Sequence, residues 1–358
     1  MNNIIKDDAQ TITLDQLLPG DILVFKTVKG DPLDDIITCL TNDSDVSHGA
    51  LFVQQKDFVL ADSAASGIGA HAMSYNKKKD NDVPRDIYVL RHNKAGQEGL
   101  PSVAAVAGSY VSQKLLYPFS DLILLAMILL FRKEVKKSFI SNIVVDFFIA
   151  LAAEIKTKIE ERDGKHTMIC SSFVYQCFMD AADQNNDPSL NLDVKNGDVG
   201  FEDCHLLGNS EPPSNSLIEL YADYATKKGE TYKNNFCANR MQLPIRPVLP
   251  MKKILEKLKD VLLKDSGEIV KSLDDIDPQL VAEIMKAIGD VIYGLSVLKN
   301  DKELTFDEIL EDVKKQHALF VTPNDLRYHL TNAEYIGFMT VYRDDDDYQG
   351  NLPKEITA

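Results

Sequence analysis

One cysteine of the chain stands where a thiol can become a nucleophile. Cys170 follows a polar stretch that begins at Asp163 and Gly164, and it lies at the start of a helix predicted over residues 168–182. The first turn of a helix carries free N–H groups and a partial positive charge, which favour the thiolate and lower the thiol pKa. The N–H groups of Cys170 and Ser171 could also hold the oxyanion of an acyl transfer. The alternative is a buried, inert cysteine.

The other cysteines suggest neither chemistry nor a disulfide framework. The chain has five, at positions 39, 170, 177, 204 and 237, and none forms a CxxC pair. Cys177 lies two helical turns after Cys170 among phenylalanines, and Cys39 lies among isoleucines and leucine, so both are predicted to be core residues. An odd number without regular spacing favours synthesis in a reducing compartment.

A thiol nucleophile needs a base, and His48 is the best candidate. It begins an apolar strand directly after a polar loop, and the end of a strand is a rigid support beside a cleft. The alternative is a surface histidine at the end of a strand. His166, four residues before Cys170, is a rival in less regular sequence. The remaining histidines, at positions 71, 92, 205, 317 and 329, lack a comparable setting.

Asp62 is the candidate for orienting the imidazole. Residues 48–54 and 58–62 alternate as two strands joined by the short polar turn 55–57, which predicts a hairpin. In that hairpin Asp62 ends beside His48, and its carboxylate could accept the ring N–H and fix the tautomer. The alternative is an ordinary turn aspartate.

Neither a metal nor another cofactor is predicted. Residues 202–205 (EDCH) include metal-ligand types, but adjacent loop residues rarely bind one ion together and no second pair stands at zinc spacing.

The remaining pattern predicts a mixed α+β chain. Residues 22–25 and 86–91 are strand candidates, and residues 31–41 form an amphipathic helix capped by Asp31. The glycines at 67 and 69 indicate a break. Residues 322–325 (TPND) predict a later helix start, flanked by two apolar runs that could be strands.

Long helical segments separate these parts. Residues 101–158 are mostly helical and very apolar, and helices are predicted near 251–264, 278–298 and 305–317. The longest apolar run, residues 122–131, is half of the roughly 20 residues that a membrane span needs. A core helix is therefore expected there, and peripheral contact with a membrane is the alternative.

Three segments together resemble NlpC-type papain-like domains. Residues 18–25 (LPGDILVF) resemble the opening strand, 47–53 (SHGALFV) the histidine strand, and 169–174 (ICSSFV) the cysteine helix. The histidine precedes the cysteine, as in the circularly permuted branch. That branch includes the YiiX/YaeF-like amidases, lecithin retinol acyltransferase and the Rho-inactivation-domain fatty acyltransferase toxins.

Further segments favour the YiiX/YaeF-like group. These are the helix 31–41, residues 117–121 (YPFSD), and residues 322–326 (TPNDL) followed by 335–337 (YIG). The resemblance implies a permuted papain-like α+β fold, with a small antiparallel sheet packed on the cysteine helix and an added helical domain. It implies Cys170 as nucleophile, His48 as base and Asp62 as the third polar residue, with Ser171 and Tyr117 at the oxyanion or substrate.

The resemblance also implies a domain layout. Residues 14–182 form the catalytic core with an apolar helical insertion at about 101–158, and residues 183–318 form a loop and helical cap. Residues 319–342 return to the core, and an acidic tail covers 343–358. Substrate choice is expected to depend on the added segments.

Composition limits the partners. The chain has 358 residues, 44% of them hydrophobic, and a formal net charge of −16, which argues against nucleic acid as a partner. The N-terminus shows no signal pattern, so we expect cytoplasmic synthesis, with export as a bacterial effector or toxin left open.

The expected function is a thiol hydrolase, amidase or fatty acyltransferase acting on a lipid, lipidated or amide substrate. One alternative is a peptidoglycan amidase or endopeptidase. An alternative of another class is a catalytically silent protein whose helical block 250–318 binds a partner protein.

Overall fold

The structure is a computed structural model. It describes residues 10–28, 30, 32–40, 45–64, 67–79, 82–113, 120–131, 134–160, 170–194, 215–238, 249–263, 268–299, 304–318, 321–344, 346 and 348–353.

Six antiparallel strands close into a barrel that carries the candidate histidine and aspartate. The order around the barrel is β1-β2-β3-β4-β6-β5. The strands are β1 (Ile22–Lys26), β2 (Val46–Gln54), β3 (Val59–Ala64), β4 (Gly67–Ser74), β5 (Arg85–His92) and β6 (Ala333–Arg343). Because β6 comes from the end of the chain and pairs with both β4 and β5, the barrel closes only when the two ends of the chain meet.

The two faces of the barrel wall bury different sets of side chains. Side chains on one face, such as Leu23, Phe25 and Phe52, fill the interior with residues from all six strands. Those on the other face, such as Val24 and Leu51, pack beneath helices. Successive side chains of a strand point to opposite faces, and here both faces are covered. The strands therefore read as continuous apolar runs rather than as alternating ones.

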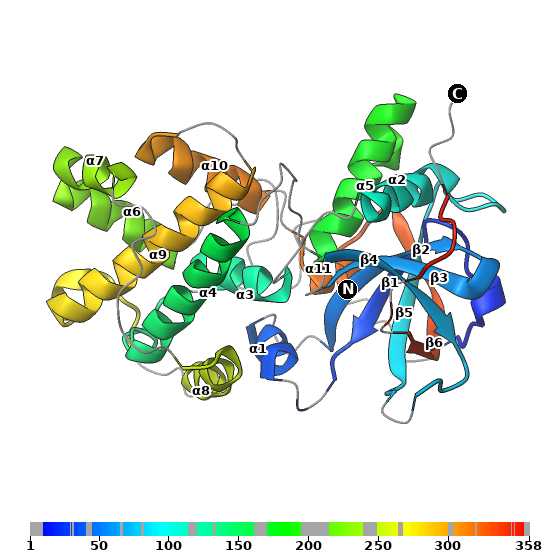
Figure 1. Cartoon of the computed structure of the whole chain (residues 1–358), viewed down its shortest axis with the longest axis horizontal. Coiled ribbons are helices and arrows are strands. Elements are labelled where there is room, and N and C mark those ends of the chain that lie inside the picture. The colour runs from blue at the N-terminus through cyan, green and yellow to red at the C-terminus, as the bar shows by residue number, and fades with distance from the viewer. Residues whose placement is uncertain are drawn as a thin grey trace, which may run out of the picture.

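Among the described helices, three cover the barrel, and most of the others form a separate helical unit (Figure 1). The covering helices are α2 (Pro101–Ser112), α5 (Cys170–Asn185) and α11 (Pro323–Tyr328), whose apolar side chains join the outer face of the barrel. The helical unit consists of α3 (Ser120–Phe131), α4 (Asn142–Glu160), α6 (Leu217–Lys228), α7 (Glu230–Ala238), α8 (Met251–Leu263), α9 (Pro278–Lys299) and α10 (Phe306–Ala318). Of the apolar segment at about 101–158, residues 101–112 thus pack on the barrel, whereas α3 and α4 belong to the helical unit.

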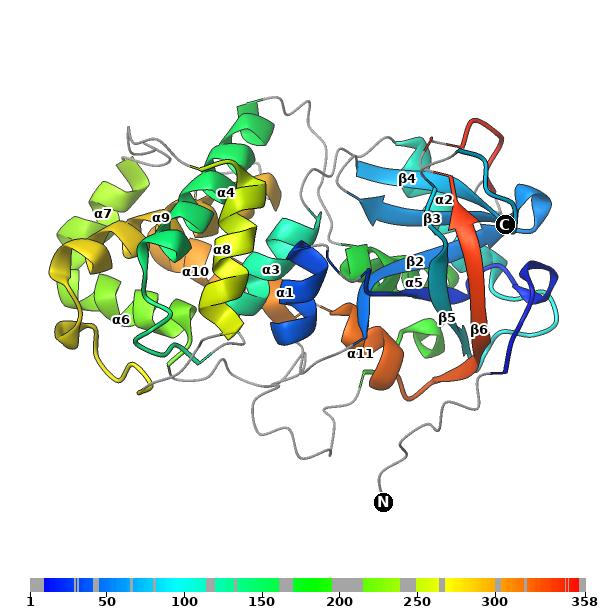
Figure 2. The same ribbon diagram turned by 90° about the horizontal axis from the view of Figure 1, so that it is seen from below.

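Helix α1 (Pro32–Leu40) lies between the barrel and the helical unit (Figure 2). It follows β1 directly, yet Ile36 and Ile37 are buried in the core of the helical unit, and the helix packs against α3 and α8. The end of the barrel beside β1 therefore faces the helical unit.

Most local predictions are confirmed. The hairpin of β2 and β3 is present, with Asp57 at a φ of 62° in its turn. The helix start at Thr322 is a capping box, in which Thr322 and Asp325 exchange hydrogen bonds of 2.8 and 3.1 Å. The predicted break at residues 66–69 is wrong, because Gly67 begins β4. Of the two apolar runs flanking α11, the later one forms β6, and the earlier one forms no strand in its described part.

Helix α3 explains the long apolar run of the sequence. Its described side chains lie in the core of the helical unit and are almost entirely buried. No described helix combines the length and the apolar character needed to cross a membrane.

Glu154 of α4 gives a prediction for the helical unit. Its side chain is half-buried, its Oε2 has no hydrogen-bond partner within the described part of the chain, and burial raises its pKa from 4.5 to about 7. The folded state therefore keeps a proton that the unfolded state loses, so stability is highest below pH 4.5 and declines as the pH rises to about 7. Glu154→Gln should raise the free energy of unfolding at pH 8 by about 1–2 kcal/mol, because solvent screens the half-exposed charge.

Thermal unfolding followed by circular dichroism at pH 4 and pH 8 measures this effect. The matched control is Glu256→Gln on the exposed face of α8. An equal gain in both variants, or a gain from Glu154→Gln that is as large at pH 4 as at pH 8, contradicts the assignment.

Candidate functional site

His48 and Asp62 lie in contact inside one end of the barrel. The His48 Nε2 atom is 2.8 Å from Asp62 Oδ2, the carboxylate is fully buried and His48 is 8% exposed. His48 is opposite Phe25 in the register of β1 and β2, and Asp62 is opposite Ala50 in that of β2 and β3. Opposed residues share a face. Since Phe25 and Ala50 belong to the interior cluster, both polar side chains point toward the axis of the barrel.

A β-bulge directly precedes His48. Phe25 pairs with His48 and Lys26 with Val46, so Ser47 is an extra residue on β2. A bulge breaks the regular alternation and redirects the side chains beside it, and bulges are enriched next to active sites. Its place directly before the candidate base is consistent with a shaped site rather than a uniform strand.

Arg343 holds Asp62 in its ionised form. Burial alone would raise the pKa of Asp62, but the charge of Arg343, followed by the contacts with His48 and His71, lowers it far below its ordinary value of 3.8. The Arg343 Nη1 atom lies 2.7 Å from Asp62 Oδ2. An ionised carboxylate can only accept, so His48 Nε2–H donates to it and the lone pair of the neutral ring is on Nδ1.

His71 of β4 is the second histidine beside Asp62. Its Nε2 lies 3.5 Å from Asp62 Oδ1, and within the described part of the chain neither atom has a hydrogen-bond partner. Its Nδ1–H donates to the backbone oxygen of Asp344 at 3.0 Å. The aspartate therefore lies among three basic side chains from three different strands.

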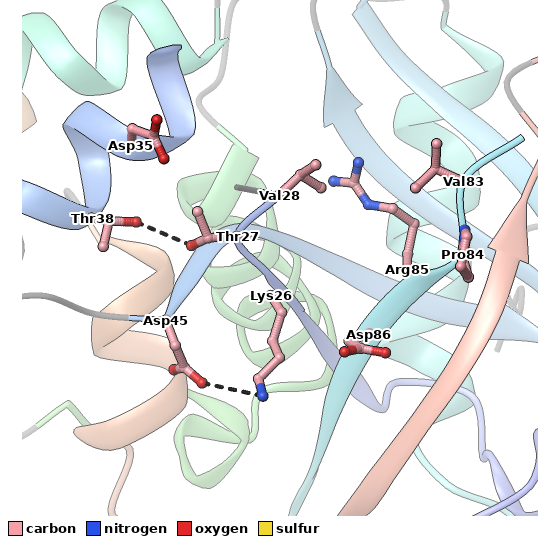
Figure 3. A pocket seen from close by; sticks show the side chains of 10 residues that line it. All are labelled: Lys26, Thr27, Val28, Asp35, Thr38, Asp45, Val83, Pro84, Arg85 and Asp86. Carbon is pink, nitrogen blue, oxygen red and sulfur yellow. Dashed lines mark hydrogen bonds and ion pairs between the residues drawn. The ribbon is translucent and has the colours of Figure 1, made fainter. Parts of the chain in front are cut away.

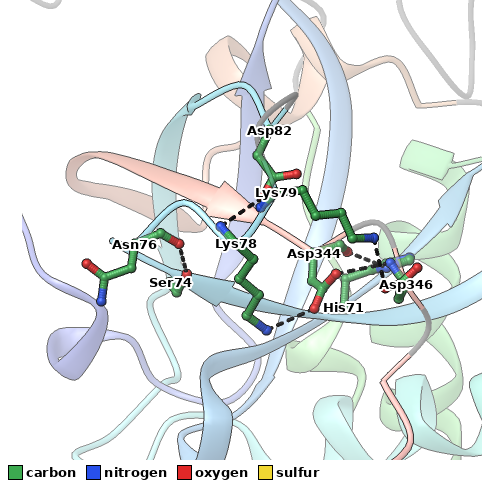
Figure 4. Close-up of polar contacts among 8 residues, drawn as sticks. All are labelled: His71, Ser74, Asn76, Lys78, Lys79, Asp82, Asp344 and Asp346. Atoms are coloured by element: carbon green, nitrogen blue, oxygen red, sulfur yellow. Dashed lines mark hydrogen bonds and ion pairs between the residues drawn. The ribbon is translucent and has the colours of Figure 1, made fainter.

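The segment after β6 contacts His71 and the lysines that follow β4 (Figure 4). Two lysines form ion pairs with this segment. Lys78 Nζ lies 2.9 Å from Asp344 Oδ2, and Lys79 Nζ lies 2.8 Å from Asp346 Oδ2. The Asp344 N–H donates to the backbone oxygen of Ala72 and continues the pairing with β4. The described part of the predicted acidic tail thus lies along the barrel.

Helix α5 packs along the strands that carry the histidine and the aspartate. It contacts β2 and β3, and the ring of Phe178 lies 5.5 Å from that of His92, at the end of β5.

The structure is silent on several predicted site residues. Cys170 begins α5 as predicted, but the side chains of Cys170 and Ser171 are outside the described part. Tyr117, His166 and residues 202–205 also lie outside the described residues. Cys177 is a buried core residue as predicted, and burial raises its thiol pKa. Within the described residues, no group of three His, Cys, Asp or Glu side chains could hold a metal ion.

Sequence reasoning missed two members of this cluster. The sequence gives His71 no setting comparable to that of His48, and Arg343 falls at the start of the predicted acidic tail. The alternation Ile68, Ala70, Ala72 on one face of β4 is a weak strand signal that could have found His71. No local signal could have found Arg343, because its contact depends on closing the barrel.

A neutral imidazole held by a buried carboxylate can act as a general base through its free nitrogen. The contact between His48 and Asp62 has the geometry that such a base and its orienting acid require. Comparison of the chain with protein-family models, with curated proteins and with solved structures finds no match.

Proposed function

We propose that this chain is a cysteine-dependent acyl-transfer enzyme in which Cys170 is the nucleophile, His48 the base and Asp62 the orienting acid. The observation that carries the proposal is the buried contact of 2.8 Å between His48 and Asp62, on the two strands along which α5 packs. Cys170 begins α5, which packs against both of these strands. The proposed fold is a permuted papain-like one built on this antiparallel sheet.

The proposed reaction proceeds through a thioester. The Cys170 thiol gives its proton to His48 Nδ1, and the sulfur attacks the acyl carbon. The tetrahedral intermediate then collapses, the bond from the acyl carbon to the leaving group breaks, and His48 returns the proton to that group. Water or an amine next attacks the thioester, loses a proton to His48 and releases the thiol. Asp62 stays ionised and stabilises the imidazolium that forms in both steps.

The mouth of the barrel is the place where sulfur and imidazole are expected to meet. His48 points into the barrel and is the first regular β2 residue after the bulge, so the ring is reached from the barrel end. In this proposal the first residue of α5, which packs outside the wall, reaches the ring across the rim of the barrel. This geometry favours a substrate that enters from the side of α1.

The proposal is tested by measuring which cysteine reacts first. Iodoacetamide alkylation followed by peptide mass spectrometry between pH 5 and pH 9 should modify Cys170 in the folded protein while Cys177 stays protected by burial. His48→Ala should move the half-point of Cys170 alkylation to higher pH, toward the ordinary thiol value of about 8.5, because the imidazolium that stabilises the thiolate is lost.

The matched control is His329→Ala. His329 also lies beside an aspartate, with its Nδ1 3.2 Å from Asp325 Oδ1, but it follows helix α11 rather than lying inside the barrel. Its replacement should leave the alkylation profile unchanged. If the alkylation profile is unchanged in His48→Ala but shifts in His166→Ala, His166 is the base. If Cys170 does not react at all, the catalytically silent, partner-binding alternative remains.

A further inference from the structure

A pocket of about 590 Å³ lies at the barrel end that carries His48 (Figure 3). Its wall is formed by the end of β1, the residue before β2, the start of β5 and one face of α1. This volume falls within the range of small-molecule sites, about 300–1,000 Å³. The pocket therefore has the size of a ligand site and lies on the side from which the proposed base is reached.

Two carboxylates of the wall are already engaged by partners. Asp35 of α1 accepts from Lys259 Nζ at 2.5 Å, and Asp86 of β5 accepts from the Thr340 hydroxyl at 2.7 Å. Neighbouring residues of a strand point to opposite faces, so Asp86 points away from the interior side on which Arg85 lies. These acids are thus held by protein groups.

The third carboxylate and the lysine of the wall engage each other. Lys26 Nζ lies 3.8 Å from Asp45 Oδ2 and 5.2 Å from the centre of the Tyr88 ring. Asp45 also accepts from the hydroxyls of Tyr88 and Tyr328, at 2.5 and 2.7 Å. Lys26 therefore already has a carboxylate partner and packs on an aromatic ring.

Arg85 is the cation of the wall that lacks such a partner. No carboxylate among the described residues lies within ion-pair distance of it, and its guanidinium carbon lies 5.8 Å from the centre of the Phe25 ring. Its guanidinium points into the space between Val28 and Val83, and Val83 is 59% exposed (Figure 3). A guanidinium group beside two valine side chains matches a ligand that has an acidic group and an apolar part.

Phe25 connects this pocket to the proposed dyad. The centre of its ring lies 5.6 Å from that of His48, edge to face, while Arg85 lies on the same ring from the pocket side. A group bound to Arg85 is therefore separated from the imidazole by one aromatic ring. That separation suits a substrate whose acidic end is bound while its acyl carbon reaches the base.

We propose that this pocket binds the acidic end of the acyl substrate. A carboxylate or phosphate pairs with the Arg85 guanidinium, and the apolar part of the ligand lies against Val28, Val83 and Pro84. The identification of this ligand as the substrate rests on the proposed acyl-transfer function. The binding itself needs no reaction.

Isothermal titration calorimetry on the Cys170→Ala protein tests the proposal with three probes of equal chain length: octanoate, octyl phosphate and neutral octanamide. At least one of the two anions should bind at least 10-fold more tightly than octanamide. Arg85→Gln should weaken the binding of that anion at least 10-fold and leave octanamide unchanged, and Arg85→Lys should restore part of the affinity. The comparison of octanoate with octyl phosphate identifies the acidic group.

The matched control is Lys79→Gln, which removes one positive charge that is paired with Asp346 on the surface. It should not change the affinity for either anion. Equal affinity for octanoate, octyl phosphate and octanamide, or equal loss in Lys79→Gln and Arg85→Gln, would overturn the proposal. Binding is measured on a protein that lacks the Cys170 thiol, so a failure to bind the anions is distinguishable from a failure of Cys170 to react. If Cys170 does not react but the anions bind, the pocket proposal stands and the acyl-transfer proposal fails.

Discussion

Cys170→Ala is expected to reduce turnover of acyl donors to the uncatalysed background while leaving the melting temperature within about 1 °C. Loss of the nucleophile removes the thioester route altogether, whereas loss of a general base costs about 10²–10⁴-fold. The measurement is hydrolysis of p-nitrophenyl octanoate and of the matching aryl amide, with intact-mass analysis for an acyl adduct. The wild-type protein should gain one acyl group on Cys170, and the variant none.

The contrasting variant is Cys177→Ala, two turns along the same helix. Cys177 is fully buried between β-barrel and helix residues, so its replacement should lower stability by about 1 kcal/mol and leave the acyl adduct on Cys170 intact. A large loss of stability in Cys170→Ala with unchanged turnover would identify Cys170 as a core residue. If the esters are inert and cell-wall fragments are cleaved instead, the peptidoglycan alternative takes the place of the lipid one.

The parts of this site that could be predicted from the sequence are those fixed by local structure. The hairpin of β2 and β3 sets the distance between His48 and Asp62 through a short turn, so two strand patterns were enough to place them together. The helix at Thr322 follows from one capping box. The amphipathic helices of the helical unit follow from apolar stripes that face one shared core, with charged residues on the opposite faces.

The rest of the site depends on contacts that no short window contains. Gly69 was read as part of a break, yet it lies opposite Asp62 in the register of β3 and β4. A glycine there adds no side chain to the interior beside Asp62, which leaves room for other side chains to approach the carboxylate. Arg343 occupies that neighbourhood from the last strand, so its role becomes visible only when β6 closes the barrel.

The same closure gives Asp62 a role in stability beside its proposed role in catalysis. Asp62→Ala is expected to lower the free energy of unfolding of the barrel by about 3–5 kcal/mol, because it leaves Arg343, whose side chain is only 18% exposed, without its counter-charge. Since the pKa of Asp62 is strongly lowered, its contribution is fully present above pH 3.8 and is lost as the pH falls below that value. Hydrogen exchange of the β3 and β6 amides measures this change locally, apart from the helical unit.

A double replacement separates the charge from the packing. In the variant Asp62→Ala, Arg343→Met, the uncompensated charge is gone and a straight apolar chain fills part of its place, so the protection of β3 and β6 should recover by at least about 1 kcal/mol relative to Asp62→Ala. Turnover should not recover with it, because His48 still lacks the carboxylate that orients its ring. If stability and turnover returned together, Asp62 would act through the fold alone and would not be needed to orient the His48 ring.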